Sequence, residues 1–531
     1  MIYLIDSNWK LKSLTLPFGW ELVQGNKLFF IIRGVSYKKQ DATYESASSN
    51  IAILRAGNLQ NGQIIFDDLV FVPQHLVDIS QLLCAGDLVV AMSSGSASVV
   101  GKVSSVEKDY NTVSFGAFCA LIRPIEASIS RWISHYFQTK HYRNYISSVA
   151  AGVNINNLRP SHLLEMQIPL PPLNEQRRIV TKIEVLKARS QRVKDALEDI
   201  PQLLDQFRQS VLAAAFRGDL TADWREQNPD VEPAIYLIKK ALDAHNIAGG
   251  HKRGNAAPPT DGVHNLTSDL FPNTWHMAEL RDICEPSRPI TYGILKPGPE
   301  MQEGVPYIRV ADFPKDKLNL AGIRKTSHQI DAQYTRSKLK TGDILLSIRG
   351  TVGRLCKIPN SLNEANITQD SARLSIQSII NTDYVLWILR SKPTQQRMQK
   401  AIKGVAVRGI NIGDVRALQI PIPPYSEQCE IVKRIKELFK LAKQIEQKYQ
   451  ETKYNLDQLD QSILAKAFRG ELVLQDPNDE PASVLLERIR TESAKLETKT
   501  AKKSKAKTSS RSTKKVQVQA EESVQLELGL E

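Results

Sequence analysis

Two long stretches of the chain repeat their seam positions in steps of three and four, with charged residues between them. This heptad spacing predicts two long amphipathic helices, over residues 174–218 and 426–470. At about 1.5 Å per residue, each helix would be about 65 Å long. The seam positions are Ile179, Ile183, Leu186, Ser190, Val193, Leu197, Ile200, Leu204, Phe207 and Val211 in the first helix, and Ile431, Ile435, Leu438, Ala442, Ile445, Tyr449, Thr452, Leu456, Leu459 and Ile463 in the second.

Local signals mark where these helices begin and end. Asn174 and Ser426 follow Pro-Pro pairs and are suitable N-caps, because their side chains can accept hydrogen bonds from free backbone N–H groups. Gly218 and Gly470 stand where a glycine would end each helix. Pro201 lies inside the first helix and predicts a kink or a break there.

The segments in front of each helix have a different pattern. Short runs rich in β-branched residues, such as KLFFIIRG, DLVVAM and GDILLSIRG, alternate with turn signals. Helical pieces, WISHYFQ and YVLWILRS, follow these runs at matching positions. This order predicts a compact α+β domain of about 160 residues, present twice.

The chain contains an internal repeat. The segment QIPLPPLNEQ ends at Gln176 and the segment QIPIPPYSEQ ends at Gln428, an offset of 252 residues. The same offset aligns SVLAAAFRGDL with SILAKAFRGEL without a gap, and weaker similarity joins LPFGW to FPNTW upstream. We infer two copies of one unit, over about residues 11–240 and 266–490, with divergent fronts and closely matched backs.

Two equal seams in one chain can pair with each other or with other chains. The globular segment between them favours antiparallel pairing inside the chain, as a coiled coil with an approximate two-fold axis. Such a pair would hold one globular domain at each end. It would also be long enough to reach separated groove segments of duplex DNA, which repeat every ~34–36 Å.

These patterns together predict the fold class α+β, with two β-rich mixed globular domains separated by a pair of long antiparallel helices. The expected parts are a first globular domain over 1–170, a first long helix over 171–220, a linker with a short helix over 221–265, a second globular domain over 266–422, a second long helix over 423–472, a short helix over 473–490, and a disordered basic tail with an acidic end over 491–531.

Charge points to an anionic partner. The formal net charge is +13 and the pI is about 9.3. Residues 491–515 hold nine basic and two acidic residues, whereas the last sixteen residues hold four Glu and no base, which leaves +10 on residues 1–490. The predicted folded part is therefore basic by itself, which favours nucleic acid over a membrane surface.

Other features narrow the class of protein. The start of the chain lacks a signal-peptide pattern, and no apolar run reaches transmembrane length. The five cysteines are scattered, so we expect neither a disulfide framework nor a zinc site, and we expect a soluble, cytoplasmic protein. Leu and Ile replace the polar residue that an adenine methyltransferase needs before Pro-Pro-aromatic, and no phosphate-binding glycine loop is present. We therefore expect no catalysis and no cofactor in this chain.

The candidate DNA contacts are basic and aromatic residues near turns of the two fronts. Guanidinium groups suit guanine edges and phosphates, ammonium groups suit phosphates, and tyrosine rings can stack on a base. Any single one of them can also be an ordinary solvated surface charge. The candidates are Arg33, Lys38, Lys39 and Arg55 in the first front, and Tyr292, Lys296, Arg309, Arg324, Lys325, Arg349, Arg354 and Arg408 in the second, with Tyr37 as a further aromatic candidate.

The repeated motifs PLPPLNEQRRIV and PIPPYSEQCEIV, with helices that end in AAFRGDL and AKAFRGEL, resemble the specificity subunit of type I restriction-modification systems. The RGVSYKK, ITYGILKPG and VPYIRVADF segments are similar to the target-recognition domains of that family. The resemblance implies a non-enzymatic subunit in which each target-recognition domain reads one half of a split, asymmetric DNA site. It also implies that the helices set the spacer and dock two methyltransferase subunits, which bind S-adenosylmethionine, and that a motor-nuclease subunit joins for restriction.

Two alternatives remain at this point. One is a coiled-coil, DNA-binding adaptor of another DNA-processing complex. The other is a fused methyltransferase, which the missing catalytic tetrapeptide and cofactor loop disfavour. The interruption at Pro201 and the 491–515 tail depart from the family pattern.

Overall fold

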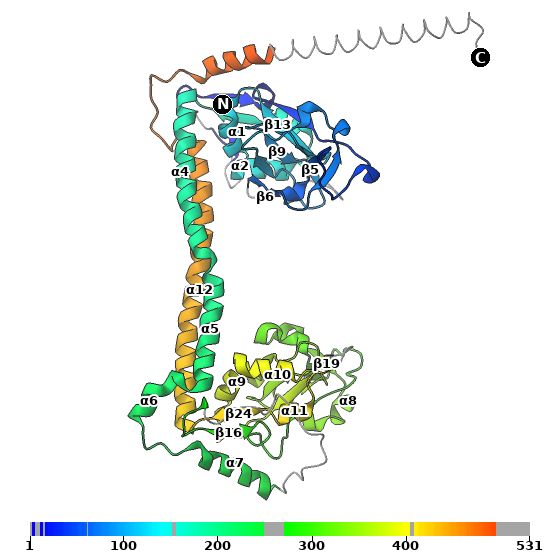
Figure 1. Ribbon diagram of the computed structural model, residues 1–531, viewed down its shortest axis with the longest axis vertical. Helices are drawn as coiled ribbons and strands as arrows, with labels where there is room; N and C mark the ends of the chain where they lie inside the picture. The colour runs from blue at the N-terminus through cyan, green and yellow to red at the C-terminus, as the bar shows by residue number, and fades with distance from the viewer. Residues whose placement is uncertain are drawn as a thin grey trace, which may run out of the picture. The chain divides into compact units, whose positions relative to one another are not determined.

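The computed structural model describes residues 3–5, 11–13, 16–60, 62–150, 156–248, 270–403 and 408–494. It consists of two compact units, each of which combines an α+β domain with part of a long helix (Figure 1). Unit 1 contains residues 1–196 and 452–531, and unit 2 contains residues 197–451. From residue 495 onward, the predicted basic tail lies outside the described residues.

The main elements of unit 1 are an antiparallel four-stranded sheet, a mixed three-stranded sheet and the strand pair β3–β15; the pairs β1–β2, β6–β7 and β10–β14 are shorter. The four-stranded sheet has the order β11-β9-β13-β4, the three-stranded sheet has the order β12-β5-β8, and β15 pairs with β3. The strands of these sheets are β3 (Glu21–Gln24), β4 (Phe29–Arg33), β5 (Asn50–Leu54), β8 (Val70–Pro73), β9 (Leu88–Ala91), β11 (Val103–Ser105), β12 (Val113–Phe115), β13 (Cys119–Pro124) and β15 (Gln167–Leu170). Shorter strands are β1 (Tyr3–Ile5), β2 (Leu11–Ser13), β6 (Leu59–Gln60), β7 (Gln63–Ile64), β10 (Ser93–Ser94) and β14 (Asn156–Asn157), and the helices are α1 (Ser130–Tyr136), α2 (Lys140–Val149) and α3 (Pro160–Leu164).

Unit 2 repeats this plan strand for strand. Its four-stranded sheet has the order β21-β20-β23-β17, its three-stranded sheet has the order β22-β18-β19, and β24 pairs with β16. The strands are β16 (His276–Glu279), β17 (Thr291–Tyr292), β18 (Val305–Ile308), β19 (Arg324–Thr326), β20 (Ile344–Ser347), β21 (Leu355–Lys357), β22 (Asn366–Ile367), β23 (Ser371–Leu374) and β24 (Gln419–Ile422). The helices of this part are α6 (Ala222–Gln227), α7 (Ala234–Ile247), α8 (His328–Ala332), α9 (Thr382–Arg390), α10 (Lys392–Lys400) and α11 (Ile412–Arg416).

The three-stranded sheets of the two units have the same mixed strand pairing. In each three-stranded sheet, one pair of strands is parallel (β5 with β12, and β18 with β22) and the other pair is antiparallel. The predicted α+β class with an internal repeat is therefore confirmed in the described residues, because a mixed sheet with the same order occurs twice.

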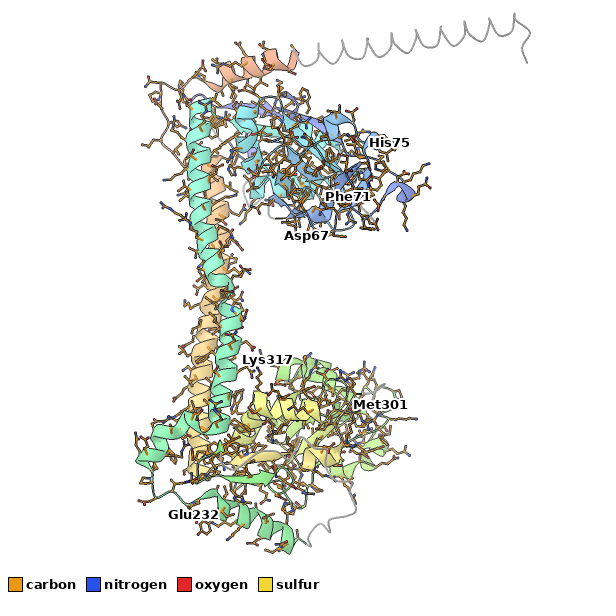
Figure 2. All side chains as sticks on the ribbon, in the orientation of Figure 1. Asp67, Phe71, His75, Glu232, Met301 and Lys317 are labelled. Carbon is orange, nitrogen blue, oxygen red and sulfur yellow. The ribbon has the colours of Figure 1, made fainter. Side chains whose placement is uncertain are left out.

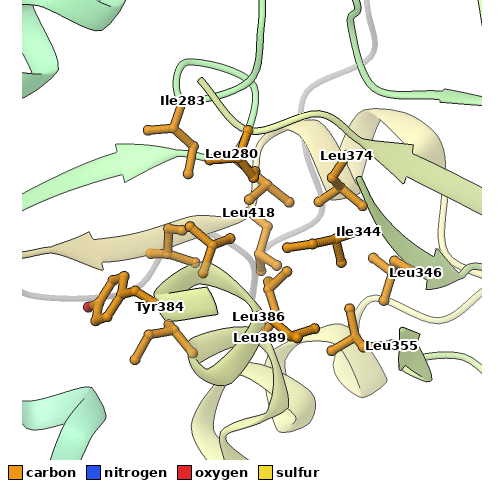
Figure 3. Close-up of a cluster of buried hydrophobic side chains, with 14 of the residues drawn as sticks. Leu280, Ile283, Ile344, Leu346, Leu355, Leu374, Tyr384, Leu386, Leu389 and Leu418 are labelled. Atoms are coloured by element: carbon orange, nitrogen blue, oxygen red, sulfur yellow. The ribbon is translucent and has the colours of Figure 1, made fainter. Parts of the chain in front are cut away.

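Each core forms where a helix covers the four-stranded sheet. In unit 2, Leu386 and Leu389 of α9 pack against Ile344 and Leu346 of β20 (Figure 3). The buried residues of α9 recur at the spacing of a helical turn, so the apolar side of this helix faces the sheet. The hydroxyl of Tyr384 donates to the carbonyl of Pro421 at 2.7 Å, which satisfies the polar end of a fully buried ring.

The long helices have the predicted extent but not the predicted starts. Helix α12 (Tyr425–Ala467) has 43 residues, while the first copy is divided into α4 (Leu173–Glu198, 26 residues) and α5 (Ile200–Arg217, 18 residues). The break at Asp199 comes two residues before Pro201, so the predicted interruption is confirmed.

The N-cap prediction is wrong. Asn174 and Ser426 lie inside the first turns of α4 and α12, because each helix begins one residue earlier. Both predicted terminal glycines are confirmed in the left-handed region, with φ of 85° at Gly218 and 73° at Gly470.

The helix seam is buried at some positions and exposed at others, and its buried positions include Ser190, Leu204 and Ala442. Ile179 and Ile183 of α4 are fully buried, and so are Ile431 and Ile435 of α12. Nearer the middle of the helices, the side chains of Val193 and Ile445 are each 43% exposed, and that of Leu459 is 51% exposed. The heptad spacing therefore marks the seam positions, but not every one of them is buried.

A buried tryptophan–carboxylate hydrogen bond ties each domain to the start of its helix. Trp20 Nε1 donates to Glu175 Oε2 in unit 1, and Trp275 Nε1 donates to Glu427 Oε2 in unit 2, both at 2.9 Å. The residue after each glutamate, Gln176 or Gln428, donates its side-chain amide to the carbonyl of the first proline of the Pro-Pro pair. The Pro-Pro-x-x-Glu-Gln motif is therefore a structural joint between the domain and the helix.

The two buried carboxylates have different surroundings. Glu427 also accepts hydrogen bonds from Arg225 Nη1 at 2.5 Å and from Thr221 Oγ1 at 2.7 Å. Within the described part of the chain, Glu175 Oε1 has no hydrogen-bond partner. Burial raises the pKa of the Glu175 carboxyl, and its hydrogen bond from Trp20 and the nearby Arg178 offset this only in part.

We expect Glu175→Gln to stabilise unit 1 above neutral pH. The folded state holds the Glu175 proton more tightly than the unfolded chain does, so the native protein loses stability as the pH rises from the ordinary glutamate range through the raised pKa. The neutral amide removes that loss and can still accept from Trp20. Hydrogen exchange of the first turns of α4, compared at low and high pH, measures the difference.

The matched control is Glu427→Gln in unit 2. It removes the ion pair with Arg225, so it should destabilise the start of α12 by about 1.5–3 kcal/mol near neutral pH. Equal effects of the two substitutions would contradict the difference between the two joints.

Candidate nucleic-acid interface

Each unit has an exposed loop that leaves the edge of its four-stranded sheet past a glycine. In unit 1 the loop follows β4 and begins at Gly34, and in unit 2 it follows β17 and begins at Gly293. A Cβ atom on Gly34 would lie 2.1 Å from the carbonyl oxygen of Gly116, and one on Gly293 would lie 2.0 Å from that of Ile367. Only glycine permits this approach of two backbones.

The residue after each glycine continues the anchor. Val35 donates its backbone N–H to Phe115 at 2.8 Å, and Ile294 donates its own to Ile367 at 2.7 Å. Both bonds belong to parallel β-bridges, Val35 with Gly116 and Ile294 with Thr368, so the two loops start in the same way in both units. Because the anchor uses backbone atoms, the side chains that follow are free to differ.

In unit 1 the loop presents three basic residues to solvent. Arg33 ends β4, Lys38 and Lys39 follow, and all three are exposed. Among the described residues their side chains form no ion pair. The neighbouring Tyr37 is half-buried and packs on the small cluster that contains Val35, so it supports the loop.

The loop of unit 1 returns to the three-stranded sheet at Thr43. The backbones of Thr43 and Phe71 exchange hydrogen bonds of 3.0 and 2.8 Å, and Figure 2 shows Phe71 in unit 1. Gln81 holds the other end, because its side-chain amide donates to the carbonyl of Arg33 at 2.9 Å. The basic residues therefore lie on a segment that is fixed at both ends.

In unit 2 three separate segments meet beside the equivalent loop. Gln369 donates its backbone N–H to Ile294 at 2.9 Å, and its side-chain oxygen accepts from Arg349 Nη1 at 2.8 Å. The backbone of Gly350 donates to the carbonyl of Arg408 at 3.0 Å. The structure thus brings Arg349 and Arg408 together near Tyr292, whose ring is 45% exposed.

Further along the same loop, a second group lies at β19. Lys296 is exposed. Arg324 pairs with Glu300 at 3.4 Å, and Lys325 Nζ donates to the carbonyl of Gln302 at 3.2 Å. Met301, labelled in Figure 2, donates its backbone N–H to Lys325 at 3.1 Å. The loop of unit 2 therefore connects the Tyr292 region to the Arg324–Lys325 strand.

Besides Arg324, Lys325 and Arg349, three further sequence candidates have partners within their own domain. Arg55 binds Asp68 at 2.6 Å, and Arg309 binds Asp312 at 2.6 Å. The hydrogen bond that the Arg309 guanidinium donates to the Asp312 carboxylate raises the pKa of Arg309. Arg354 is half-buried and reaches the carbonyl of Val310 at 3.4 Å. These contacts hold turns of the domain, which their place in the sequence did not reveal.

Sequence reasoning missed the two anchoring glycines and Gln369. The glycines stood beside basic residues in RGVSYKK and TYGILKPG, where a comparison of the two fronts could have aligned them. The amide of Gln369 is partly exposed beside Arg349. An amide next to a guanidinium is a combination that can bind adenine and guanine edges.

The described residues offer little for other chemistries. No group of three or more His, Cys, Asp or Glu side chains that could hold a metal ion occurs in them. In the same residues, no helix has both the length and the apolar character to cross a membrane. What the domains do present is an exposed loop, anchored by a glycine in the same way in each, with basic side chains on it or beside it.

One α+β module, built twice with a glycine-anchored loop at the same strand end, is the architecture of a protein with two separate recognition domains. The model of the type I restriction modification DNA specificity domain matches the chain twice, over residues 17–201 and 272–453. These matches cover more than half of the chain, and each begins at the proline that opens a repeat. The chain belongs to this family.

Relatives of this chain match along almost their whole length. It is 33% identical over 514 residues to the type I restriction enzyme EcoKI specificity subunit of Escherichia coli strain K12, and 32% identical over 505 residues to the StySPI specificity subunit of Salmonella potsdam. Each alignment covers 92% of this chain and 99% of the relative.

Solved structures share the fold. A chain from work on the complex assembly and conformational transition of the type I R-M system has a TM-score of 0.61 at 20% identity, over 87% of this chain and 100% of that one. The HsdS subunit from Thermoanaerobacter tengcongensis has a TM-score of 0.50 at 20% identity, over 86% of this chain and 98% of that subunit.

We expect Gly34→Ala to displace the loop of unit 1. The new Cβ would meet a backbone carbonyl at 2.1 Å, so β4 and β12 must separate, at a cost of about 1–3 kcal/mol. Faster hydrogen exchange at Val35 and weaker DNA binding would report the change. Gly57→Ala is the matched control in the same unit, because nothing lies within 4 Å of its added Cβ. Similar effects of both substitutions would show that the close approach does not matter.

Proposed function

We propose that the protein is the DNA sequence-specificity subunit of a type I restriction-modification complex, in which each α+β domain reads one half of a bipartite, asymmetric site. The observation that carries this proposal is the glycine-anchored loop, which occurs at the same strand end in both domains while its side chains differ. One scaffold with two different reading surfaces suits a site with two different halves.

In this proposal the residues divide between the two half-sites. Exposed basic side chains on the loops provide phosphate contacts, and guanidinium and amide groups reach base edges. Arg55, Arg309 and Arg354 keep their internal partners and hold the reading surfaces in place. The proposed contacts are Arg33, Lys38 and Lys39 for one half-site, and Tyr292, Lys296, Arg324, Lys325, Arg349 and Arg408 for the other.

The helices set the distance between the half-sites by antiparallel, coiled-coil pairing. The order of contacts in unit 1 supports this. Arg178 binds Asp479, and Lys194, further along α4, binds Asp457, which lies earlier in the sequence than Asp479, as expected for antiparallel segments. The domain boundaries follow from the repeat, with reading domains over 1–170 and 266–422.

The same helices dock two methyltransferase subunits, and motor-nuclease subunits join for restriction. Exposed apolar side chains on the helices, Val185, Leu203, Leu441 and Tyr454, provide a surface for such partners. This chain performs no catalysis, the methyltransferase subunits bind S-adenosylmethionine, and the complex acts on double-stranded DNA in the cytoplasm.

Exchanging residues 1–170 for the front of another specificity subunit should change only one half of the methylated sequence. The wild-type complex should methylate adenine in a split motif with a fixed gap, because each domain reads independently. Sequencing of methylated adenines in cells that express the complete complex measures both motifs. A continuous palindrome, or a change in both halves, would contradict the two-domain proposal.

Replacing basic loop residues with alanine should weaken DNA binding, and the loss should grow with the number of phosphate contacts that are removed. For Lys38→Ala with Lys39→Ala, the slope of log K against log salt should fall by about 0.9 for each of these phosphates. Titration of the assembled methyltransferase with its DNA at several salt concentrations measures this slope.

Lys27→Ala is the matched control for this titration. Lys27 is exposed but precedes β4, whereas the loop follows the strand, so about 16 Å of strand separates them. An unchanged slope in the double variant, or an equal loss in the control, would remove the loop from the proposed interface.

A further inference from the structure

The two units contain ion pairs at equivalent positions with opposite signs. In unit 1, Lys194 Nζ of α4 lies 2.8 Å from the carboxylates of both Asp457 and Asp460 of α12. The repeat offset of 252 residues relates Lys194 to Glu446 and Asp460 to Arg208. In unit 2 these two residues form their own pair, with Arg208 Nη2 at 2.8 Å from Glu446 Oε2.

A second reversal occurs at the starts of the helices. In unit 1, Arg178 Nη2 binds Asp479 Oδ2 at 2.6 Å, and the Asp479 side chain is 6% exposed. The repeat equivalent of Arg178 is Glu430, which instead binds Arg434 on its own helix at 2.7 Å. Arg434 in turn binds Asp223, from the front half of the chain, at 2.6 Å.

Apart from Glu430–Arg434, which lies within α12, these pairs join the front half to the back half of the sequence. If two copies of the back half met through the same helix faces, Glu446 of one copy would face Asp457 and Asp460 of the other. Glu430 would face Asp479, and a two-fold axis would repeat every one of these acid–acid contacts. Buried Glu427 would also lose Arg225, which only the front half supplies.

Two copies of the front half meet a weaker obstacle. Lys194 of one copy would face Arg208 of the other, but it would also face Asp205, the repeat equivalent of Asp457. The charge pattern therefore excludes self-pairing mainly in the back half.

We propose that the acidic face of α12 is a pairing code, which accepts the α4–α5 face of a front half and rejects a second copy of the back half. The partner that fits this face is a front half with Lys or Arg at the positions of Lys194 and Arg208 on α4–α5 and of Arg225 on α6. The inference depends on the proposed pairing of the helices inside the chain, but not on which DNA is read. Like charges placed opposite each other are a common means of excluding wrong partners.

The test uses the full chain with a protease site inserted between residues 249 and 269, cut after folding. Isotope-labelled and unlabelled cut proteins are mixed in mild urea until front–back complexes of mixed label show that halves have exchanged. Native mass spectrometry then measures the proportions of front–back, front–front and back–back complexes. The code predicts front–back complexes and almost no back–back complexes, whereas binomial proportions of all three species would overturn it.

Reversing the charge of two acidic residues of α12 should allow two back halves to pair. Glu430→Arg with Glu446→Lys gives α12 the residue types that Arg178 and Lys194 provide in unit 1, so two back halves could form the unit 1 ion pairs with each other. The back–back species should then rise by about tenfold or more. Glu446→Lys alone should give a smaller rise in the same direction and serves if the double variant folds poorly.

The matched control is Glu437→Lys with Glu451→Lys. It changes the same helix by the same net charge at two exposed positions outside these pairs. Equal species distributions for this control and for E430R/E446K would overturn the proposal. Failure of the proposed DNA function would show in the methylated motif and would leave these distributions unchanged, so the two outcomes are separable.

Discussion

A buried carboxylate at the start of each long helix connects the parts of this protein. Glu175 and Glu427 lie in first turns, where the positive end of the helix dipole favours an anion, and each accepts a tryptophan N–H from its domain. The strand pairs β3–β15 and β16–β24 lead directly into the same turns. A charge buried in this way requires fixed partners, so the joint permits one orientation of each domain on its own helix.

The reading loops follow a different principle. Gly34 and Gly293 are held by contacts between backbones, so the anchor does not depend on the side chains of the residues that follow. A loop with a fixed start and free side chains can change its DNA contacts without changing the domain that carries it. This separation explains how one topology, repeated strand for strand, can hold two dissimilar sets of basic and aromatic residues.

The sequence allowed the architecture to be predicted because the helices and the repeat depend on local patterns. Heptad spacing located α12, Pro201 located the break before α5, and Gly218 and Gly470 marked the helix ends. The exposure of Ile445 depends on which residues surround it in the folded chain, and heptad spacing alone does not predict this. The parallel pairing of β5 with β12 joins residues too distant for any local signal.

The candidate site was predictable only in outline. Basic residues near turns identified both loops, but the carboxylate partners of Arg55 and Arg309 depend on the folded geometry of their turns. Gln369 becomes a candidate only because two other segments place it beside Arg349. Charge along a chain indicates a surface, and contacts between distant segments decide which side chains are available on it.

The division of the chain between the units also has a consequence for its synthesis. Unit 2 is one continuous segment, whereas unit 1 needs residues on both sides of it. Gly19 accepts a backbone hydrogen bond from Ala482, and Pro17 lies against Gly470. The first part of unit 1 therefore leaves the ribosome before unit 2, yet unit 1 is completed after it, and until then the surface that contacts residues 452–494 stays uncovered. Contacts between residues so far apart in the sequence form slowly. The front half of the nascent chain therefore exposes this surface for longest, which favours misassembly and chaperone binding.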